Sequence, residues 1–100
     1  MNLNQVKKLM DRKKNSRKGE NGSVLIIGGS EQYVGAVTLA GLAALRAACD
    51  SVTIAAPEKV AWAVHRYSPD LMTYKMRAGN FTVRDAKEMV KLAEKFDAVL

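Results

Sequence analysis

Cysteine and long apolar runs are both scarce in this sequence, and each scarcity excludes a class of protein. The single cysteine, Cys49, excludes an internal disulfide and a cysteine metal cluster, and it favours a reducing, cytosolic setting. The longest apolar stretch, from Val34 to Leu45, is far short of the ~20 residues that span a bilayer. The first ten residues hold no apolar run, so we expect no signal peptide. These absences favour a cytoplasmic protein that does not enter a membrane.

The composition suits a compact α/β fold. Hydrophobic residues make up 48% and charged residues 26% of the 100 positions, which is typical of one folded domain or a piece of one. A domain this short buries a smaller share of its surface than a larger one does. A core this apolar therefore predicts that further chain or a partner covers part of it.

The net charge of +6 is concentrated in the first 18 residues. We interpret residues 1–18 as a basic N-terminal arm, with a short amphipathic helix at 2–12, and residues 19–100 as the N-terminal part of an α/β domain. Basic patches can serve nucleic acid or acidic membranes, but this arm lacks interleaved aromatics and a recognisable reading motif. We therefore favour a solvated arm over a nucleic-acid contact. The charged residues of the arm are Asp11 and the bases Lys7, Lys8, Arg12, Lys13, Lys14, Arg17 and Lys18.

Apolar periodicity predicts strands that alternate with helices. The run at 24–27 is typical of a strand covered on both faces, and the apolar residues of 35–48 fill their helix nearly all round, which predicts a buried helix. Gly41 in that helix costs ~1 kcal/mol relative to alanine, so we expect close packing against a neighbouring element. The alternation favours βαβ crossovers and a largely parallel sheet. The predicted strands are 24–27, 51–56, 71–76 and 97–100, and the predicted helices are 2–12, 35–48, 57–67 and one that starts at 83.

Side-chain patterns add expectations within these elements. A turn is expected at 78–80, and Thr82 is expected to cap the last helix. Apolar residues at helical or strand spacing are expected to face the core. They are Val60, Ala61, Trp62 and Val64 in the helix at 57–67, Met72, Tyr74 and Met76 in the strand at 71–76, and Val83, Ala86, Val90 and Ala93 in the last helix, which should lie on the outside of the domain.

The candidate binding chemistry lies in the turn that follows the first strand. Two adjacent glycines, Gly28 and Gly29, let a ligand approach main-chain N–H groups directly. The spacing fits neither common nucleotide motif, because Ser30 and Tyr33 stand where the dinucleotide fingerprint needs glycines, and no Gly-Lys-Ser/Thr follows. Ligands of parallel sheets collect at the carboxyl ends of the strands, which selects residues 28–30, the segment around Ala56 and whatever follows residue 100. The glycines could equally serve only to join strand to helix, so the residues alone leave both interpretations open.

The turn and its surroundings resemble the ADP- or ATP-dependent NAD(P)H-hydrate dehydratase family, a branch of the ribokinase-like fold. The resemblance runs from about residue 17 to residue 76. Where this family usually has histidine, glycines and glutamate, the chain has Arg17, the segment 48–50 and Asp70. The matching features are Lys18-Gly19 and Gly22, the turn Gly28-Gly29-Ser30, Tyr33, the pair Gly35-Ala36, the segment Leu45-Arg46-Ala47, the strand exit at 52–57 and the run at 69–72.

The resemblance implies a parallel-sheet, three-layer ribokinase-like α/β fold, of which residues 19–100 would be the N-terminal portion, truncated at the C-terminal end. It implies repair of hydrated NADH or NADPH, in which ADP or ATP with Mg²⁺ phosphorylates the ring hydroxyl before elimination. The catalytic aspartate of the family belongs to a later motif, so we name no catalytic residue and no metal ligand in this chain. A homo-oligomer and an epimerase, fused or separate, are open as partners. The residues implied to face the substrate are Gly28, Gly29, Ser30, Tyr33, Gly35 and Ala36.

Two other functions stay open. One is a ribokinase-like kinase of a vitamin precursor or sugar, and the other is a non-enzymatic module that binds a nucleotide or nucleic acid through the basic arm. His65 has no second metal ligand or nucleophile at helical spacing, which favours an ordinary surface or core histidine. Asp85, Glu88 and Glu94 lie in a charged helical segment, which favours solvated surface over general-base catalysis.

Overall fold

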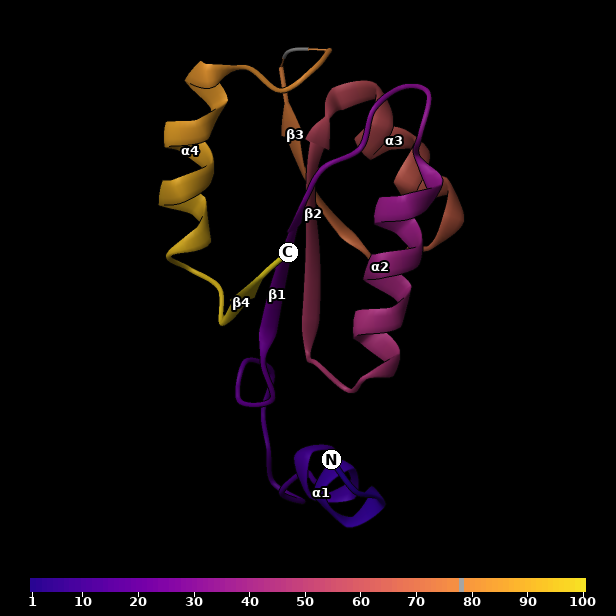
Figure 1. Ribbon diagram of the computed structural model, residues 1–100, viewed down its shortest axis with the longest axis vertical. Helices are drawn as coiled ribbons and strands as arrows, with labels where there is room; N and C mark the ends of the chain where they lie inside the picture. Colours follow the sequence, from indigo (N-terminus) through magenta and orange to yellow (C-terminus); the bar gives the residue numbers. More distant parts are fainter. Residues whose placement is uncertain (78) are drawn as a thin grey trace.

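Strands and helices alternate along the chain as expected, and the structure, a computed structural model, describes residues 1–77 and 79–100. The elements are α1 (Leu3–Leu9), β1 (Ser23–Ile27), α2 (Gly35–Arg46), β2 (Ser51–Pro57), α3 (Glu58–Tyr67), β3 (Met72–Met76), α4 (Val83–Ala93) and β4 (Ala98–Val99). The strands form one parallel sheet in the order β3-β2-β1-β4. Figure 1 shows α2 and α3 on one face of this sheet and α4 on the other, which confirms the three-layer α/β arrangement.

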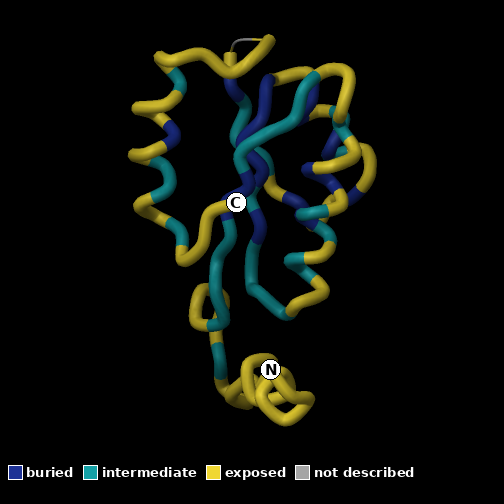
Figure 2. Tube along the Cα trace, in the orientation of Figure 1, coloured by how far each residue is buried: buried dark blue, intermediate teal, exposed yellow. Residues whose placement is uncertain are grey.

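The core lies on both faces of the sheet, because successive residues of a strand point to opposite faces. On one face, Ile26 and Ile54 pack with residues of α2 and α3. On the other face, Leu25 and Ala55 pack with residues of α4. These four side chains are buried, and Figure 2 shows that burial is concentrated in the middle strands. The apolar run of β1 is thus covered on both faces, as predicted.

Gly41 lies where α2 comes closest to the sheet. A Cβ at this position would lie 2.8 Å from Leu71 Cδ2 and 3.1 Å from Ile54 Cδ1, which confirms the predicted close packing. The expectation that this helix is buried nearly all round is wrong. Leu39 is 70% exposed, and only Val37, Thr38 and Gly41 of the helix are buried, because α2 meets the sheet along one side.

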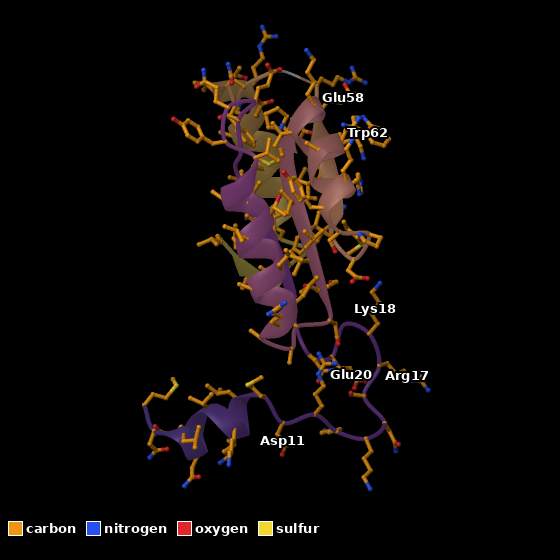
Figure 3. The ribbon with its side chains drawn as sticks, turned by 90° about the vertical axis from the view of Figure 1, so that its right-hand side faces the viewer. Asp11, Arg17, Lys18, Glu20, Glu58 and Trp62 are labelled. Atoms are coloured by element: carbon orange, nitrogen blue, oxygen red, sulfur yellow. The ribbon has the colours of Figure 1, made fainter. Side chains whose placement is uncertain are left out.

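Trp62 does not pack in the core, which contradicts the expectation for the helix at 57–67. Val60, Ala61 and Val64 are buried as predicted, but Trp62 is 56% exposed and lies on the outer side of α3 (Figure 3). The Nζ of Lys75 lies 4.5 Å from the centroid of its ring. A cation–π contact at an exposed site contributes about 0.5–1 kcal/mol, so the aromatic ring is held without entering the core.

The helix α4 faces the sheet with a different set of side chains from the predicted one. Val83 and Val90 are 90% and 67% exposed, and Ala86 is exposed as well. Met89 is buried instead, and Leu92 packs beside it in the cluster with Leu25 and Ala55. Both sets recur at helical spacing, and the longer side chains are the ones that reach the sheet, so the predicted stripe is wrong except at the partly buried Ala93.

The strand β3 and the start of α4 follow the expectations more closely. Met76 is buried and Tyr74 is partly buried in the cluster on the α4 side, whereas Met72, 41% exposed, is not the core residue that was predicted. Thr82 precedes the first residue of α4 as predicted, and its N–H donates to the Asp85 carboxylate at 2.7 Å. The predicted turn at 78–80 includes Ala78, which lies outside the described residues.

The basic arm begins with the short helix α1. The Asn2 side chain caps this helix by accepting a hydrogen bond from the N–H of Gln5 at 3.0 Å. None of its residues is buried, and the predicted apolar side, at positions 6, 9 and 10, is exposed. Figure 3 shows the helix lying apart from the sheet. Among the described residues, no helix is long and apolar enough to cross a bilayer.

Asp50 fixes the segment between the arm and β1. Its carboxylate accepts hydrogen bonds from the N–H groups of Asn21 and Gly19 at 2.9 and 2.7 Å, and Arg12 Nη1 lies 3.3 Å away. The hydrogen bond from the Asn21 backbone, with those from the Asn21 side chain and Gly19 and the charge of Arg12, lowers the pKa of Asp50, although burial opposes this shift. Gly19 and Gly22 both have positive φ, so the glycines that flank this segment are required by its backbone path.

The Asp50 contacts should break as the carboxyl group is protonated. Because its pKa is lowered in the folded chain, the stabilisation is complete above the ordinary value of 3.8 and is lost as the pH falls through the folded-state pKa. The amide proton shifts of Gly19 and Asn21, followed by NMR, should therefore titrate together with a midpoint below 3.8.

The variant Asp50→Ala should abolish this titration and raise the rate of proteolysis in residues 10–18 at neutral pH. Asp11→Ala is the matched control, because it removes the same charge from an exposed residue of the arm. Equal cleavage rates in the two variants would show that Asp50 does not hold the arm.

Candidate functional site at the carboxyl ends of the strands

The turn that follows β1 is shaped by packing. Gly29 has φ +90°, a conformation that side-chain-bearing residues rarely adopt, and a Cβ there would lie 2.9 Å from Val60 Cγ1. A Cβ on Gly28 would lie 3.2 Å from Val37 Cγ1, and the Gly28 N–H donates to the Ala55 carbonyl at 3.1 Å. Gly29 is therefore needed for α3 to close over the end of the strand, and a side chain at Gly28 would crowd Val37, whatever else the turn does.

The loop from the turn to α2 is exposed and folds back on itself. Ser30 and Tyr33 form an isolated antiparallel bridge, in which the Tyr33 N–H donates to the Ser30 carbonyl at 3.0 Å. The Tyr33 side chain is 72% exposed. The Glu31 carboxylate lies 3.9 Å from the Lys59 ammonium in the first turn of α3, and both side chains are largely exposed. This loop thus presents polar groups and an aromatic ring to whatever approaches the sheet edge.

The start of α2 is open. Gly35 and Ala36 are both exposed, and a Cβ on Gly35 would find no atom within 4 Å. The residue before the helix, Val34, offers no side-chain cap, so the first N–H groups of α2 have no side-chain partner from that position. Unlike Gly28 and Gly29, this pair is not explained by packing, and it leaves room beside uncapped amide groups.

The strand order places this turn at a branch point of the sheet. β1 pairs with β2 on one side and with β4 on the other, and the connecting helices α2 and α4 lie on opposite faces (Figure 1). In parallel sheets, ligands bind in the crevice that such a branch opens outside the carboxyl ends of the strands. The structure therefore brings the six sequence-predicted residues together at this edge. Ala56, at the end of β2, is instead fully buried and packs below Gly29, so it is not an accessible site residue.

One segment of this edge was missed by the reasoning from sequence. Gly79 and Asn80, in the loop that follows β3, line a hollow of about 320 Å³ together with Ser30, Glu31 and Gln32. The rule that selects the carboxyl ends of strands applies to β3 as well, so the signal was present.

His65 has partners that helical spacing could not reveal. Its Nε2 lies 2.7 Å from Thr73 Oγ1 and 3.4 Å from Lys75 Nζ, and both partners come from the neighbouring strand β3. Of the acids, Asp85 caps α4 and Glu88 accepts a hydrogen bond from the Tyr74 hydroxyl. Within residues 1–77 and 79–100, no group of three or more His, Cys, Asp or Glu could hold a metal ion.

The fold is the α/β fold of ribokinase-like proteins. A ribokinase-like superfamily protein from Enterococcus faecalis V583 superposes with a TM-score of 0.75 over 99% of this chain and 33% of its own chain. Its sequence identity is 20%, so this similarity shows the fold alone. A hypothetic protein from Streptococcus mutans superposes with a TM-score of 0.73 over 94% of this chain and 32% of its own, at 30% identity.

Residues 24–100 match the family described as NAD(P)H-hydrate dehydratase, and the chain belongs to this family. The bifunctional NAD(P)H-hydrate repair enzyme Nnr of Methanothermobacter thermautotrophicus is 47% identical over 93% of this chain. The ADP-dependent (S)-NAD(P)H-hydrate dehydratase of Cenarchaeum symbiosum is 40% identical over 78% of it, and the ATP-dependent (S)-NAD(P)H-hydrate dehydratase of Entamoeba histolytica is 35% identical over 85%. The chain spans 18% of the length of the first relative and 27% of the other two.

The two kinds of glycine at this edge should respond differently to the same substitution. Gly29→Ala should destabilise the fold by about 2–4 kcal/mol, because it combines an unfavourable φ with a Cβ overlap on Val60. Gly35→Ala should change the free energy of unfolding by less than about 0.5 kcal/mol, since its Cβ enters open space at the start of a helix. Chemical denaturation followed by circular dichroism measures both, and equal losses would refute the distinction.

Proposed function

We propose that the protein to which this chain belongs repairs hydrated NADH and NADPH by nucleotide-dependent dehydration. The observation that carries the proposal is the match of residues 24–100 to the NAD(P)H-hydrate dehydratase family. The ADP-dependent and ATP-dependent names of the relatives support a nucleotide as phosphoryl donor. This chain contributes to substrate binding through the turn at 28–36, and we assign it no catalytic residue.

The proposed reaction turns a poor leaving group into a good one. The hydroxyl oxygen on the hydrated nicotinamide ring attacks the terminal phosphorus of ATP or ADP, and the bond from that phosphorus to the nucleotide breaks. The carbon–oxygen bond then breaks, so that inorganic phosphate leaves with the former hydroxyl oxygen. Loss of a proton from the adjacent ring carbon restores the double bond. The products are NADH or NADPH, the shortened nucleotide and phosphate.

The substrate contacts are proposed at the carboxyl edge of β1. We assign Gly35 and Ala36 to the ring and ribose, because small exposed residues beside uncapped amide groups allow close approach. Ser30 and the exposed Tyr33 ring supply polar and stacking contacts to the same ligand. Gly28 and Gly29 shape the turn that presents the other four residues.

Magnesium is proposed only as the ion that accompanies the nucleotide phosphates. Glu31 is the acid of the loop at 30–34, and it lies beside Lys59. The described residues offer no cluster of three potential ligands, so we assign no magnesium ligand in this chain and derive no step through the ion.

The cellular setting is proposed to be the cytoplasm, where hydrated NADH and NADPH would arise. We further propose an epimerase, fused or separate, as a companion activity, which the bifunctional name of the Methanothermobacter relative supports. A homo-oligomer is proposed to cover part of the apolar surface that α2 exposes.

The full-length protein tests the reaction. Incubated with hydrated NADPH and either ATP or ADP, it should regenerate absorbance at 340 nm, the ordinary signal of the reduced ring, and release one phosphate per ring restored. Accumulation of a stable phosphorylated product would instead identify a small-molecule kinase. Loss of nucleic-acid binding on deletion of residues 1–18, with no dehydration by the intact protein, would support the non-enzymatic alternative.

Ala36→Leu should weaken substrate binding without unfolding the protein. A leucine side chain at the open start of α2 would occupy the space assigned to the ring, so the KM for hydrated NADH should rise about tenfold, which corresponds to one well-packed contact. Ala43→Leu is the matched control, because Ala43 is an exposed alanine two turns further along the same helix. An unchanged KM in Ala36→Leu would remove this residue from the site.

A further inference from the structure

A second hollow lies at the carboxyl edge of the sheet, beside the site already described. It has a volume of about 890 Å³ and lies between the end of β3 and the first turns of α4. Tyr74 and Arg77 line it from the strand side, and Thr82 and Arg84 line it from the helix side. The exposed guanidinium groups of Arg77 and Arg84 make it a candidate for anion binding.

The acids of this groove are already engaged. The Asp85 carboxylate accepts from the Thr82 N–H at 2.7 Å and from the Thr82 hydroxyl at 3.0 Å. Glu88 accepts from the Tyr74 hydroxyl, and this hydrogen bond raises the pKa of Tyr74. The acids are therefore held by groups other than the arginines.

The basic residues that line this groove differ in whether their side chains are already engaged by other groups. Lys75 also lines it, but its ammonium donates to Thr73 Oγ1 at 3.0 Å and lies over the Trp62 ring on the α3 side. Among residues 1–77 and 79–100, the ion pairs are Arg12 with Asp50 and Lys59 with Glu31. Neither Arg77 nor Arg84 is in such an ion pair, so the N–H donors of both guanidinium groups are available to a ligand.

The groove lies at the same end of the sheet as the proposed substrate site. Arg77 and Thr82 line the groove, and Gly79 and Asn80, which lie between them in the sequence, line the smaller hollow beside Ser30. β3 and β1 are separated by β2 alone, so the two strands are about 10 Å apart within the sheet. The groove lies on the α4 side of the sheet, and the turn at 28–36 leads into α2 on the other side.

We propose that Arg77 and Arg84 bind the phosphate groups of a nucleotide in this groove. The inference rests on the proposed function, because the nucleotide is either the hydrated dinucleotide itself or the ADP or ATP that drives its dehydration. The geometry favours the dinucleotide, since the groove lies at the same carboxyl edge of the sheet as the turn at 28–36, and Gly79 and Asn80 line a hollow with Ser30. Planar guanidinium groups suit phosphate oxygens because each can donate two parallel hydrogen bonds.

Calorimetric titration of the full-length protein with NADPH tests the groove directly. The double variant Arg77→Gln/Arg84→Gln should bind NADPH at least about tenfold more weakly for each arginine removed, as expected for charge-assisted hydrogen bonds. Lys91→Gln is the matched control, since it removes a positive charge from an exposed residue of α4 that does not line the groove. An NADPH affinity that is unchanged in the double variant and equal to that of the control would overturn the proposal for the dinucleotide.

Titrations with ATP and ADP distinguish the two sources of phosphate. If the double variant loses affinity for NADPH alone, the groove binds the substrate. If it loses affinity for ATP or ADP alone, the groove binds the phosphoryl donor. Unchanged affinity for all three ligands overturns the proposal. Both arginines are exposed, so the unfolding temperature of the double variant should match that of the wild type. Should the variant fail to fold, competition between inorganic pyrophosphate and NADPH on the wild type decides instead, and an absence of competition overturns the proposal.

Turnover measurements separate this inference from the proposed function. If the wild type dehydrates hydrated NADPH and the double variant keeps the wild-type KM for both substrates, the groove proposal fails and the proposed function stands. If the wild type shows no dehydration but the double variant loses NADPH or ATP affinity, the groove proposal stands and the proposed function fails.

Discussion

The position of β1 between β2 and β4 is the constraint on which the rest of this structure depends. Parallel pairing on both edges satisfies the backbone of the strand, and helices on both faces bury Leu25 and Ile26 in separate clusters. The helices α2 and α4, which lead into β2 and β4, lie on opposite faces, so the strand order reverses between β1 and β4. Ligand crevices form at such a point outside the carboxyl ends of the strands, so the topology places the site before any one side chain does.

The same constraint separates the glycines of the turn into two groups. Gly28 and Gly29 lie where α2 and α3 converge on the end of β1, and added Cβ atoms would approach Val37 and Val60 at 3.2 and 2.9 Å. A glycine that packing requires gives no information about a ligand. Gly35 faces open space at a helix start that lacks a side-chain cap, so packing does not explain its small size, and the proposed substrate contact remains compatible with it.

The succession of elements could be predicted because strand runs and glycine breaks are local properties, and the carboxyl-edge rule selected residues 28–30 of the candidate site from them. The side of each helix that packs on the sheet could not be predicted in this way. In α4, valines at 83 and 90 compete with Met89 and Leu92 for the same sheet, and periodicity does not say which set is long enough to reach it. Trp62 was misjudged for a related reason, since its partner Lys75 comes from a neighbouring strand. Family membership followed from several short features together, none of which is decisive alone.

Discrimination among proteins of this fold must come from the loops. A ribokinase-like protein that is 20% identical shares the arrangement at a TM-score of 0.75, so the packed strand and helix positions define the fold and not a particular ligand. Exposed residues at the carboxyl edge, in the segment 30–36 and at positions 77 and 79–84, can vary without disturbing the core. They include a tyrosine, small residues and two arginines, and this combination suits a ligand that has both a ring and phosphates.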